Sequence, residues 1–221
     1  MGASPRNGEK ITLFQMAQTS VIKQLTEKKA RKIINHFGRV LGPEIQRMRF
    51  GRLHSAAGLV ELAWDLPKDG AGLEIGSFSG ESTVIFRCCG AGHVTCVDIW
   101  GGPNPDDRAK SSEARFDRAT AMVGGVEKIK GDSVDAMGLM VAEGETFDWV
   151  YIDGDHSEEA VAADIIAALP LVKPGGFLCG HDYGRTLHPG VSLAVDRLLG
   201  KPERVYRDSS WLFQSPTLRH G

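Results

Sequence analysis

Acidic and histidine side chains recur just after the apolar stretches of this chain. Asp98 ends one apolar run, Asp153 and His156 follow another, and His181 and Asp182 follow a third. Carboxylates and imidazoles are groups that accept protons in general base catalysis and that bind cations. If the apolar runs are neighbouring strands, these side chains bring such chemistry to one edge of a sheet.

A glycine-containing segment precedes this series. Residues 71–80 read Ala-Gly-Leu-Glu-Ile-Gly-Ser-Phe-Ser-Gly, so that Glu74 closes a short apolar run and a helical stretch follows Gly80. Glycine lets the backbone approach a ligand closely, and the start of a helix offers unpaired N–H groups. Asp98 follows Gly76 at the spacing of about 20 residues at which an acid accepts hydrogen bonds from ribose hydroxyls. The stretch predicts a cofactor that contains adenosine.

The elements that would position these groups alternate between strand and helix. After the strands that end near Glu74 and at Asp98, the pattern predicts strands at 126–130, 147–152, 177–180, 204–207 and 211–214, and helices at 56–64, 114–123, 134–142, 158–169 and 191–199. Such alternation requires a parallel sheet with helices on both faces. The fold class is therefore α/β: a Rossmann-like, doubly wound sheet of about seven strands, mostly parallel, with one antiparallel strand from the terminal hairpin.

The N-terminal part lies outside this unit. Phe14, Ala17, Val21 and Leu25 recur at helical spacing, and Gly42-Pro43 ends the pattern after a polar tail at residues 1–10. We divide the chain into residues 1–53, a tail and helical extension, and residues 54–221, the cofactor-binding domain. Packing on the core is the default role of the extension; a lid over the substrate or a homodimer interface are the alternatives.

Composition limits the class of protein. The formal net charge of −2 favours no nucleic-acid partner, and no apolar run is long enough to cross a membrane. The four cysteines contain no Cys-x-x-Cys pair and are expected as reduced thiols. We therefore expect a cytoplasmic protein. Trp64, Trp149 and Trp211 are expected in the core.

Five segments carry a family resemblance. Over about residues 54–215 the chain resembles the class I S-adenosylmethionine-dependent methyltransferases, and it does so at residues 73–80, 97–101, 130–133, 151–157 and 173–183. The strings Ile-Asp-Gly-Asp-His-Ser and Gly-His-Asp-Tyr are similar to those of the branch that includes sugar and small-molecule O-methyltransferases. The resemblance implies transfer of a methyl group to a small molecule, most often to a hydroxyl oxygen.

The resemblance also implies which residues bind S-adenosylmethionine. The loop after the first strand would hold the methionine portion, the acid after the second strand the ribose, and the turn after the third strand the adenine. By position these residues are Glu74, Gly76, Ser77, Phe78 and Gly80, then Asp98, Ile99 and Trp100, then Asp132 and Ser133, with Asp153 beside them. Phe78 departs from the pattern, because many members have a second glycine there.

Two ways of removing the hydroxyl proton remain open. In metal-dependent relatives, acids at the positions of Asp153 and Asp182 bind a magnesium-class ion, which lowers the pKa of the substrate hydroxyl. Tyr183 stands where catechol-type relatives have an amide ligand. Alternatively, His156 or His181 provides metal-free base catalysis. The predicted catalytic residues are therefore His156, His181 and Asp182. His36, His54, His93, His188 and His220 have no comparable position and are interpreted as structural.

Two other functions are considered. An NAD-type oxidoreductase would also place an acid after the second strand, but the chain lacks the Gly-x-Gly-x-x-Gly spacing, and the terminal hairpin disfavours that class. A non-catalytic scaffold would bind the cofactor without turnover. Specificity for the acceptor is expected to reside in residues 1–57 and in the loops 101–113 and 183–190.

Overall fold

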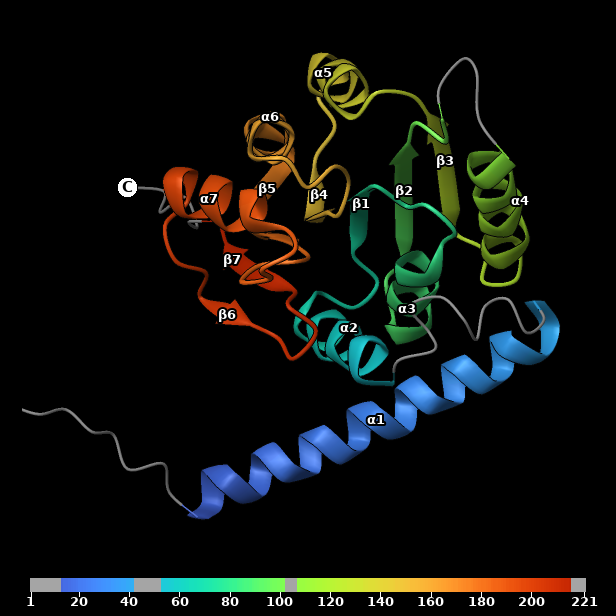
Figure 1. The fold of residues 1–221 in the computed structure, drawn as a ribbon, viewed down its shortest axis with the longest axis vertical. Coiled ribbons are helices and arrows are strands. Elements are labelled where there is room, and N and C mark those ends of the chain that lie inside the picture. Colours follow the sequence, from blue (N-terminus) through green and yellow to red (C-terminus); the bar gives the residue numbers. More distant parts are fainter. Residues whose placement is uncertain (1–12, 42–52, 102–106, 216–221) are drawn as a thin grey trace, which may run out of the picture.

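A seven-stranded sheet with helices on both faces forms the centre of the molecule (Figure 1). The computed structural model describes residues 13–41, 53–101 and 107–215. The strand order is β3-β2-β1-β4-β5-β7-β6, with β1 to β5 parallel and β7 antiparallel to β5 and to β6. The strands are β1 (Ala71–Ile75), β2 (His93–Asp98), β3 (Val126–Lys130), β4 (Phe147–Ile152), β5 (Val172–Gly180), β6 (Arg204–Val205) and β7 (Trp211–Gln214). The fold class that the sequence predicts is confirmed.

The helices divide between two apolar cores, one on each face of the sheet. Buried side chains of the first four helices pack with one face, and those of the last three pack with the other. The helices are α1 (Leu13–Leu41), α2 (Leu53–Asp65), α3 (Glu81–Cys89), α4 (Asp107–Ala121), α5 (Ser133–Glu143), α6 (Glu158–Ala168) and α7 (Pro189–Leu198), with a 3₁₀ turn at Leu169–Leu171. Burial on both faces explains why the central strands β1, β2 and β4 are mostly apolar, whereas the edge strand β3 contains both apolar and charged residues.

The predicted loop 101–113 is partly wrong, because α4 already begins at Asp107. A second difference lies in β5, where glycine and proline are tolerated inside a strand. The prediction places a turn at 173–176, but β5 already pairs with β4 at Val172, and the register shifts between Phe147 and Trp149. Gly175 has φ of 77°, so glycine bends the strand without ending it. β6 is shorter than predicted because Tyr206 N–H donates to the Ser210 carbonyl across a turn, at 2.8 Å.

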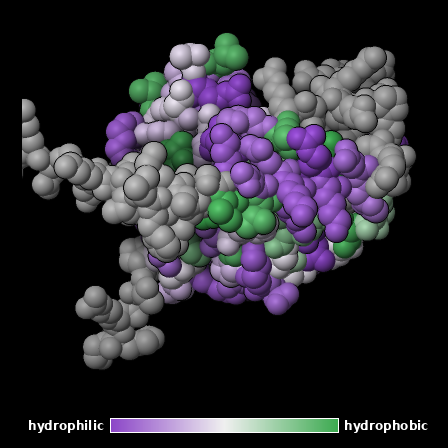
Figure 2. Space-filling model, turned by 90° about the horizontal axis from the view of Figure 1, so that it is seen from below, coloured by the Kyte–Doolittle hydropathy of each residue, from purple (hydrophilic) through white to green (hydrophobic). Residues whose placement is uncertain are grey.

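The N-terminal extension is one long helix, and only part of its apolar stripe, which continues from Leu25 to Ile33 and Ile34, packs on the core. Thr26, Ala30 and Ile33 of α1 are buried, whereas Val21 and Leu25 are 53% and 50% exposed. Figure 2 shows the face of the molecule on the α1 side as mainly hydrophilic, with separate hydrophobic patches. Pairing of two chains through α1 stays a prediction.

A cluster of polar contacts connects α1 to α2 and to the terminal hairpin. Arg207 donates to Glu27 at 2.9 Å and to the Thr26 hydroxyl at 3.2 Å, and it also pairs with Glu61 of α2. Figure 1 shows α1 running past α2 and α3 on the side away from the upper ends of β2 and β3.

Several predictions are decided by burial, and some fall on residues outside the described part. All four cysteines are free thiols, as predicted.

Two of the three tryptophans predicted in the core are found there. Trp149 and Trp211 are buried, but Trp64 is 37% exposed, so its assignment to the core is wrong. Among the described helices, none combines the length and apolar character that a membrane span requires. The tail at 1–10, the break at Gly42-Pro43 and most of the loop at 101–107 lie outside the described residues.

Candidate functional site

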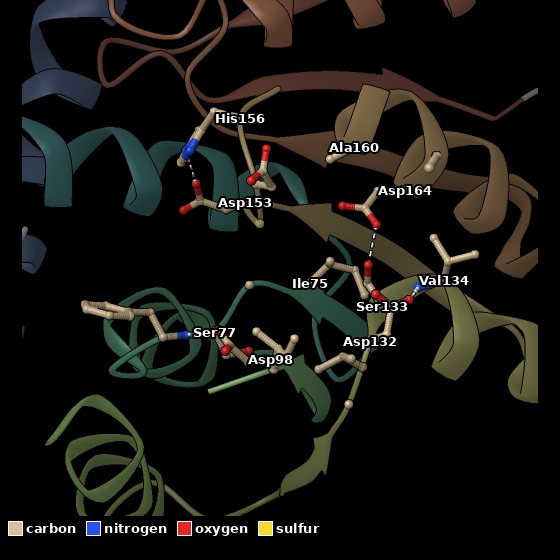
Figure 3. Close-up of a pocket in the computed structure, with 18 of the residues that line it drawn as sticks. Ile75, Ser77, Asp98, Asp132, Ser133, Val134, Asp153, His156, Ala160 and Asp164 are labelled. Atoms are coloured by element: carbon tan, nitrogen blue, oxygen red, sulfur yellow. Dashed lines mark hydrogen bonds and ion pairs between the residues drawn. The ribbon is translucent and has the colours of Figure 1, made fainter. Parts of the chain in front are cut away.

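A cavity of about 810 Å³ opens at the carboxyl ends of the central parallel strands. In Figure 3, Asp153 and His156 lie on one side of it, and Asp132, Ser133 and Asp164 lie on the other. No described residue of α1 is among those that line it. The lining comes from the segments after β1 to β4 and from α6: Ile75, Gly76, Ser77, Phe78, Glu81, Ser82, Val97, Asp98, Ile99, Gly131, Asp132, Ser133, Val134, Asp153, Gly154, Asp155, His156, Ala160, Ala163 and Asp164.

The loop after β1 is held close to the end of β4. Gly76 has φ of 84°, and a Cβ at this position would lie 2.1 Å from the Asp153 carbonyl oxygen. Only glycine fits here, because of both the left-handed backbone and the close contact. Gly80 has φ of 81° at the N-cap of α3. Gly76 therefore forms part of the cavity wall. Gly80 does not line the cavity and instead begins α3.

Asp98 links the loops that follow β1 and β2. Its two carboxylate oxygens accept from Phe78 N–H at 2.8 Å and from Trp100 N–H at 2.7 Å. Both of these residues have positive φ, 44° for Phe78 and 37° for Trp100. Phe78 thus adopts the left-handed conformation for which glycine is favoured. An acid at this position fixes the cavity wall in addition to its predicted role at the ribose.

Two predicted cofactor residues of these segments are buried away from the cavity. Trp100 packs against Phe116, with ring centroids 4.8 Å apart, and its indole N–H donates to the Phe78 carbonyl at 2.7 Å. Glu74 is fully buried and accepts from the Ser77 hydroxyl at 2.9 Å, from the Cys96 thiol at 3.4 Å and from the Thr83 hydroxyl. Burial raises the pKa of Glu74. Ile99, in contrast, lines the cavity and is 54% exposed.

The far end of the cavity contains a carboxylate that the sequence analysis did not identify. Asp132 caps α5 by accepting from Val134 N–H at 2.9 Å, and Ser133 donates to Asp164 of α6 at 2.6 Å. Burial raises the pKa of Asp164 to about 6. Asp164 lies inside a predicted helix, so a search of strand ends could not find it; an acid on the apolar face of that helix was the available signal.

The predicted catalytic groups converge at the other end. His156 Nε2 lies 2.9 Å from Asp182 Oδ2 and 3.7 Å from Asp153 Oδ1. His181 Nδ1 lies 3.0 Å from Asp182 Oδ1 and 4.0 Å from Asp153 Oδ1. Both aspartates are nearly buried, whereas the His156 side chain is 32% exposed. Asp153, His181 and Asp182 each offer one ligand atom within 4.8 Å of the others, which suits a cation.

Electrostatics and backbone geometry mark the same place. The carboxylates of Asp153 and Asp182 raise the pKa of His156 to about 9, because two negative charges favour the imidazolium form. Asp182 itself has φ of 63°. Left-handed conformations of non-glycine residues concentrate at functional sites, where the surrounding structure enforces them.

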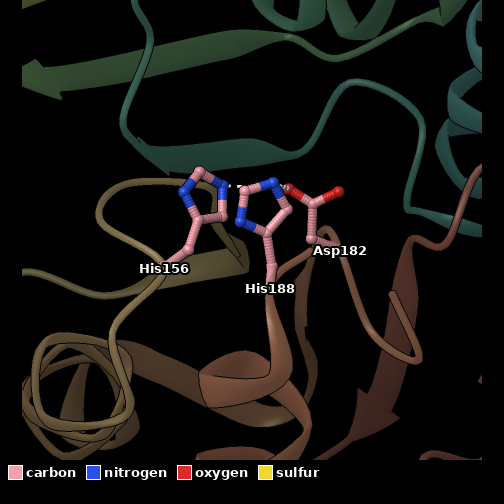
Figure 4. Close-up of side chains that lie close together, drawn as sticks. All are labelled: His156, Asp182 and His188. Carbon is pink, nitrogen blue, oxygen red and sulfur yellow. Dashed lines mark ion pairs between the residues drawn. The ribbon is translucent and has the colours of Figure 1, made fainter. Parts of the chain in front are cut away.

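A third histidine, His188, joins His156 and His181, and its interpretation as structural is therefore incomplete. His188 is the N-cap residue of α7, and its ring stacks on His156 with centroids 4.1 Å apart. Its Nε2 lies 3.9 Å from Asp182 Oδ2 (Figure 4). The contact joins two loops distant in sequence, and only the position of His188 just before Pro189 and a helix could have suggested it.

Comparison with known families decides the class of this fold. The family model described as a methyltransferase domain matches residues 73–183, about half of the chain. The chain belongs to this family. The matched segment contains every predicted cofactor and catalytic residue, and it ends before His188. No match is found among curated proteins.

Solved structures agree with the assignment of the methyltransferase fold. CalS11, a TDP-rhamnose 3'-O-methyltransferase of calicheamicin biosynthesis, is 14% identical, with 96% of this chain and 99% of that chain covered and a TM-score of 0.52. An O-methyltransferase from Bacillus cereus in complex with SAH is 20% identical, covering 70% and 76%, with a TM-score of 0.50. SMU.776, also complexed with SAH, is 12% identical with a TM-score of 0.54; 72% of this chain matches 48% of that one. At these identities the likeness shows the fold.

Proposed function

We propose that this protein transfers the methyl group of S-adenosylmethionine to a hydroxyl oxygen of a small molecule. The observation that supports the proposal is that Asp98 and His156 line the same cavity. The acid predicted to bind the ribose and the predicted base can therefore act on one bound cofactor and its acceptor. Its volume of about 810 Å³ lies in the range of small-molecule and cofactor sites.

The residues of the cavity fit an adenosyl cofactor. Both oxygens of Asp98 already accept backbone N–H groups, and each retains a further lone pair for a ribose hydroxyl. Asp132 and Ser133 line the end proposed for adenine, and Gly76 and Ser77 line the end proposed for methionine. When bound, this cofactor supplies an electrophilic methyl group on a sulfonium. The protein must orient the acceptor in line with it and remove the proton.

His156 is the proposed proton acceptor. Its side chain lines the cavity and is 32% exposed, but Nε2 itself is buried against Asp182, so the ring must turn before an acceptor hydroxyl can reach this atom. With a pKa of about 9, the ring is mainly protonated at neutral pH and accepts a proton only after losing its own. The rate should therefore rise with pH toward 9.

A divalent cation is the second component of the proposal. Asp153, His181 and Asp182 offer two carboxylates and one imidazole, and an oxygen-rich set of this kind suits a magnesium-class ion. Such an ion would stabilise the acceptor alkoxide, and its positive charge would offset the two carboxylates that hold the proton on His156.

Two measurements test the function itself. Calorimetry with S-adenosylhomocysteine and with NADH separates the two nucleotide classes: binding of the first and not of the second is expected, and the reverse would reject the methyltransferase. Labelled-methyl transfer to a panel of sugars, catechols and amines then separates an enzyme from a scaffold. Labelling of a hydroxyl acceptor is expected, and cofactor binding with no transfer to any class would favour the scaffold.

The two routes of proton removal are separated by chelation. Activity should be measured from pH 6 to pH 10 with EDTA and with added Mg²⁺. Dependence on the ion supports the cation at Asp153 and Asp182. Full activity in EDTA, with a rate that rises toward pH 9, supports His156 alone.

A further inference from the structure

His156, Asp182 and His188 form a group that the proposed reaction does not require as a unit. They come from three segments: the loop after β4, the end of β5 and the first residue of the α7 cap. One ligand atom from each lies within 4.8 Å of the others. Figure 4 shows both imidazole rings beside each other and facing the Asp182 carboxylate.

The two oxygens of Asp182 face different partners. Oδ1 lies 3.0 Å from His181 Nδ1 and 3.2 Å from the Arg185 guanidinium. Oδ2 lies 2.9 Å from His156 Nε2 and 3.9 Å from His188 Nε2. The two imidazoles therefore share one oxygen, on the side of the carboxylate away from Arg185, and both side chains are about one-third exposed. The two side chains are thus partly accessible, although His156 Nε2 itself is buried.

The backbone holds the two histidines in this arrangement. A Cβ on Gly190 would lie 2.6 Å from the His156 carbonyl oxygen and 2.5 Å from the Glu158 nitrogen. The start of α7 thus contacts the turn after β4 as closely as a glycine allows. His188 N–H also donates to the Arg185 carbonyl at 3.1 Å. Ligands that are already fixed lose little conformational entropy when they bind.

We propose that His156, Asp182 and His188 bind a late first-row transition ion such as Zn²⁺, Co²⁺ or Ni²⁺. Two imidazoles and one carboxylate form a donor set that these ions prefer, whereas Mg²⁺ prefers oxygen ligands. Binding releases the proton that His156 carries at neutral pH, so the affinity should rise with pH. The group therefore differs in selectivity from the set of Asp153, His181 and Asp182. The two sets share Asp182, so an ion in one deprives the other of a ligand.

The consequence for activity rests on the proposed function. An ion at this site engages His156 Nε2, the atom proposed to accept the substrate proton. Occupancy by Zn²⁺ should then inhibit methyl transfer, and the site would make the enzyme sensitive to transition ions.

Calorimetric titration of the EDTA-treated and dialysed full chain with Zn²⁺ tests the binding, and Co²⁺ absorption reports the ligand set. His188→Ala should weaken Zn²⁺ binding by about 100-fold or more, since even residues outside the ligand shell change metal affinity about 10–100-fold. His93→Ala is the matched control, because His93 is also partly exposed and lies 3.7 Å from a carboxylate of Glu127. His181→Gln, which removes a ligand of the other set, should change Zn²⁺ affinity little.

Equal Zn²⁺ affinity in the wild type and in His188→Ala would overturn the site, as would a loss that follows His181→Gln and not His188→Ala. S-adenosylhomocysteine binding by His188→Ala, measured in EDTA, shows that the variant is folded. Methyl transfer in EDTA tests the proposed function separately: an inactive wild type with intact, His188-dependent Zn²⁺ binding would reject the function and retain the site.

Discussion

Two polar clusters, one around Glu74 and one around Asp182, are each centred on a buried carboxyl group near the carboxyl ends of the parallel strands, and they differ in the groups that surround it. Glu74 is fully buried among neutral hydroxyl and thiol donors. Asp182 is equally buried but lies beside His156, His181 and Arg185. Burial raises the pKa of Glu74, whereas Asp182 contributes to raising that of a histidine. Burial therefore disfavours the charge of the first carboxyl group, whereas the second has basic side chains beside it.

The difference separates a structural role from a chemical one. Glu74 accepts from Ser77, Thr83 and Cys96 through one oxygen, Oε2, and so connects the loop after β1 to α3 and β2 without lining the cavity. The carboxylate of Asp182 lies beside imidazoles that can gain or lose a proton, so this cluster can transfer protons or bind a cation. Position after a strand does not distinguish the two. The surrounding donors do.

The largest expected effect is on the chemical cluster. His156→Gln preserves size and polarity but cannot accept a proton at neutral pH, so kcat should fall by about 10²- to 10⁴-fold. Affinity for S-adenosylhomocysteine should be retained, because the backbone of the cavity is unchanged. Steady-state transfer assays and calorimetry measure the two quantities. His93→Gln is the control, and wild-type kcat in His156→Gln would show that another group removes the proton.

A smaller effect, a loss of cofactor affinity, is expected for Asp98. Like Glu74 it holds neighbouring loops through hydrogen bonds, and like the Asp182 cluster it belongs to the predicted site. Asp98→Ala leaves the N–H groups of Phe78 and Trp100 without their carboxylate and removes the proposed ribose contact. A hydrogen bond to a charged group contributes about 1.5–3 kcal/mol, so affinity for S-adenosylhomocysteine should fall about 10- to 100-fold. Calorimetry measures it, and Asp98→Asn, which keeps one acceptor oxygen, should lie between. An unchanged affinity in Asp98→Ala would contradict the ribose assignment.

The sequence predicts the frame of the site better than its far ends. The bounds of β3, β4 and β7 agree with the prediction, because each is an apolar or alternating run bordered by glycine or acidic turn residues. The acids that follow the parallel strands β3 and β4, Asp132 and Asp153, lie at one edge of the sheet, because the carboxyl ends of parallel strands meet there. Features that depend on the local sequence pattern, such as strand bounds and the acids that follow strands, could be predicted.

Contacts between helices and loops that are distant in the sequence could not be predicted from it. His188 reaches His156 only because α7 packs on the turn after β4, at Gly190. Trp100 follows a strand like the cavity residues, yet it packs against Phe116 of α4. Neither outcome is encoded in spacing along the chain, because each depends on how one helix packs against a loop from another part of the sequence.

Asp164 gives an intermediate effect that depends on pH. Its pKa is raised to about 6 by burial, so its stabilising contribution is full below the unfolded pKa near 3.9 and is lost as pH rises through 6. Asp164→Asn removes this cost. The variant should match the wild type near pH 4 and be more stable at pH 8 by up to about 3 kcal/mol, from a shift of about two units. Thermal unfolding at both pH values measures it, and a constant difference would reject the titration of Asp164.

The smallest effect is expected where the sequence pattern is strongest, at Glu74. Burial raises the pKa of Glu74 and so disfavours its charge, and Glu74→Gln has a similar shape and keeps one carbonyl oxygen to accept from Thr83 or Ser77. The new NH₂ group must find an acceptor, and the hydroxyls of Ser77 and Thr83 can rotate to provide one. The melting temperature and the affinity for S-adenosylhomocysteine should therefore change little, while Asp182→Asn, the same substitution type in the chemical cluster, should impair transfer strongly. Glu74→Ala tests the packing, since it leaves a cavity and buried hydroxyls without a partner, and unfolding should show a clear loss. If Glu74→Gln were as damaging as Asp182→Asn, the charge of Glu74 would be needed, and the two clusters would share one role.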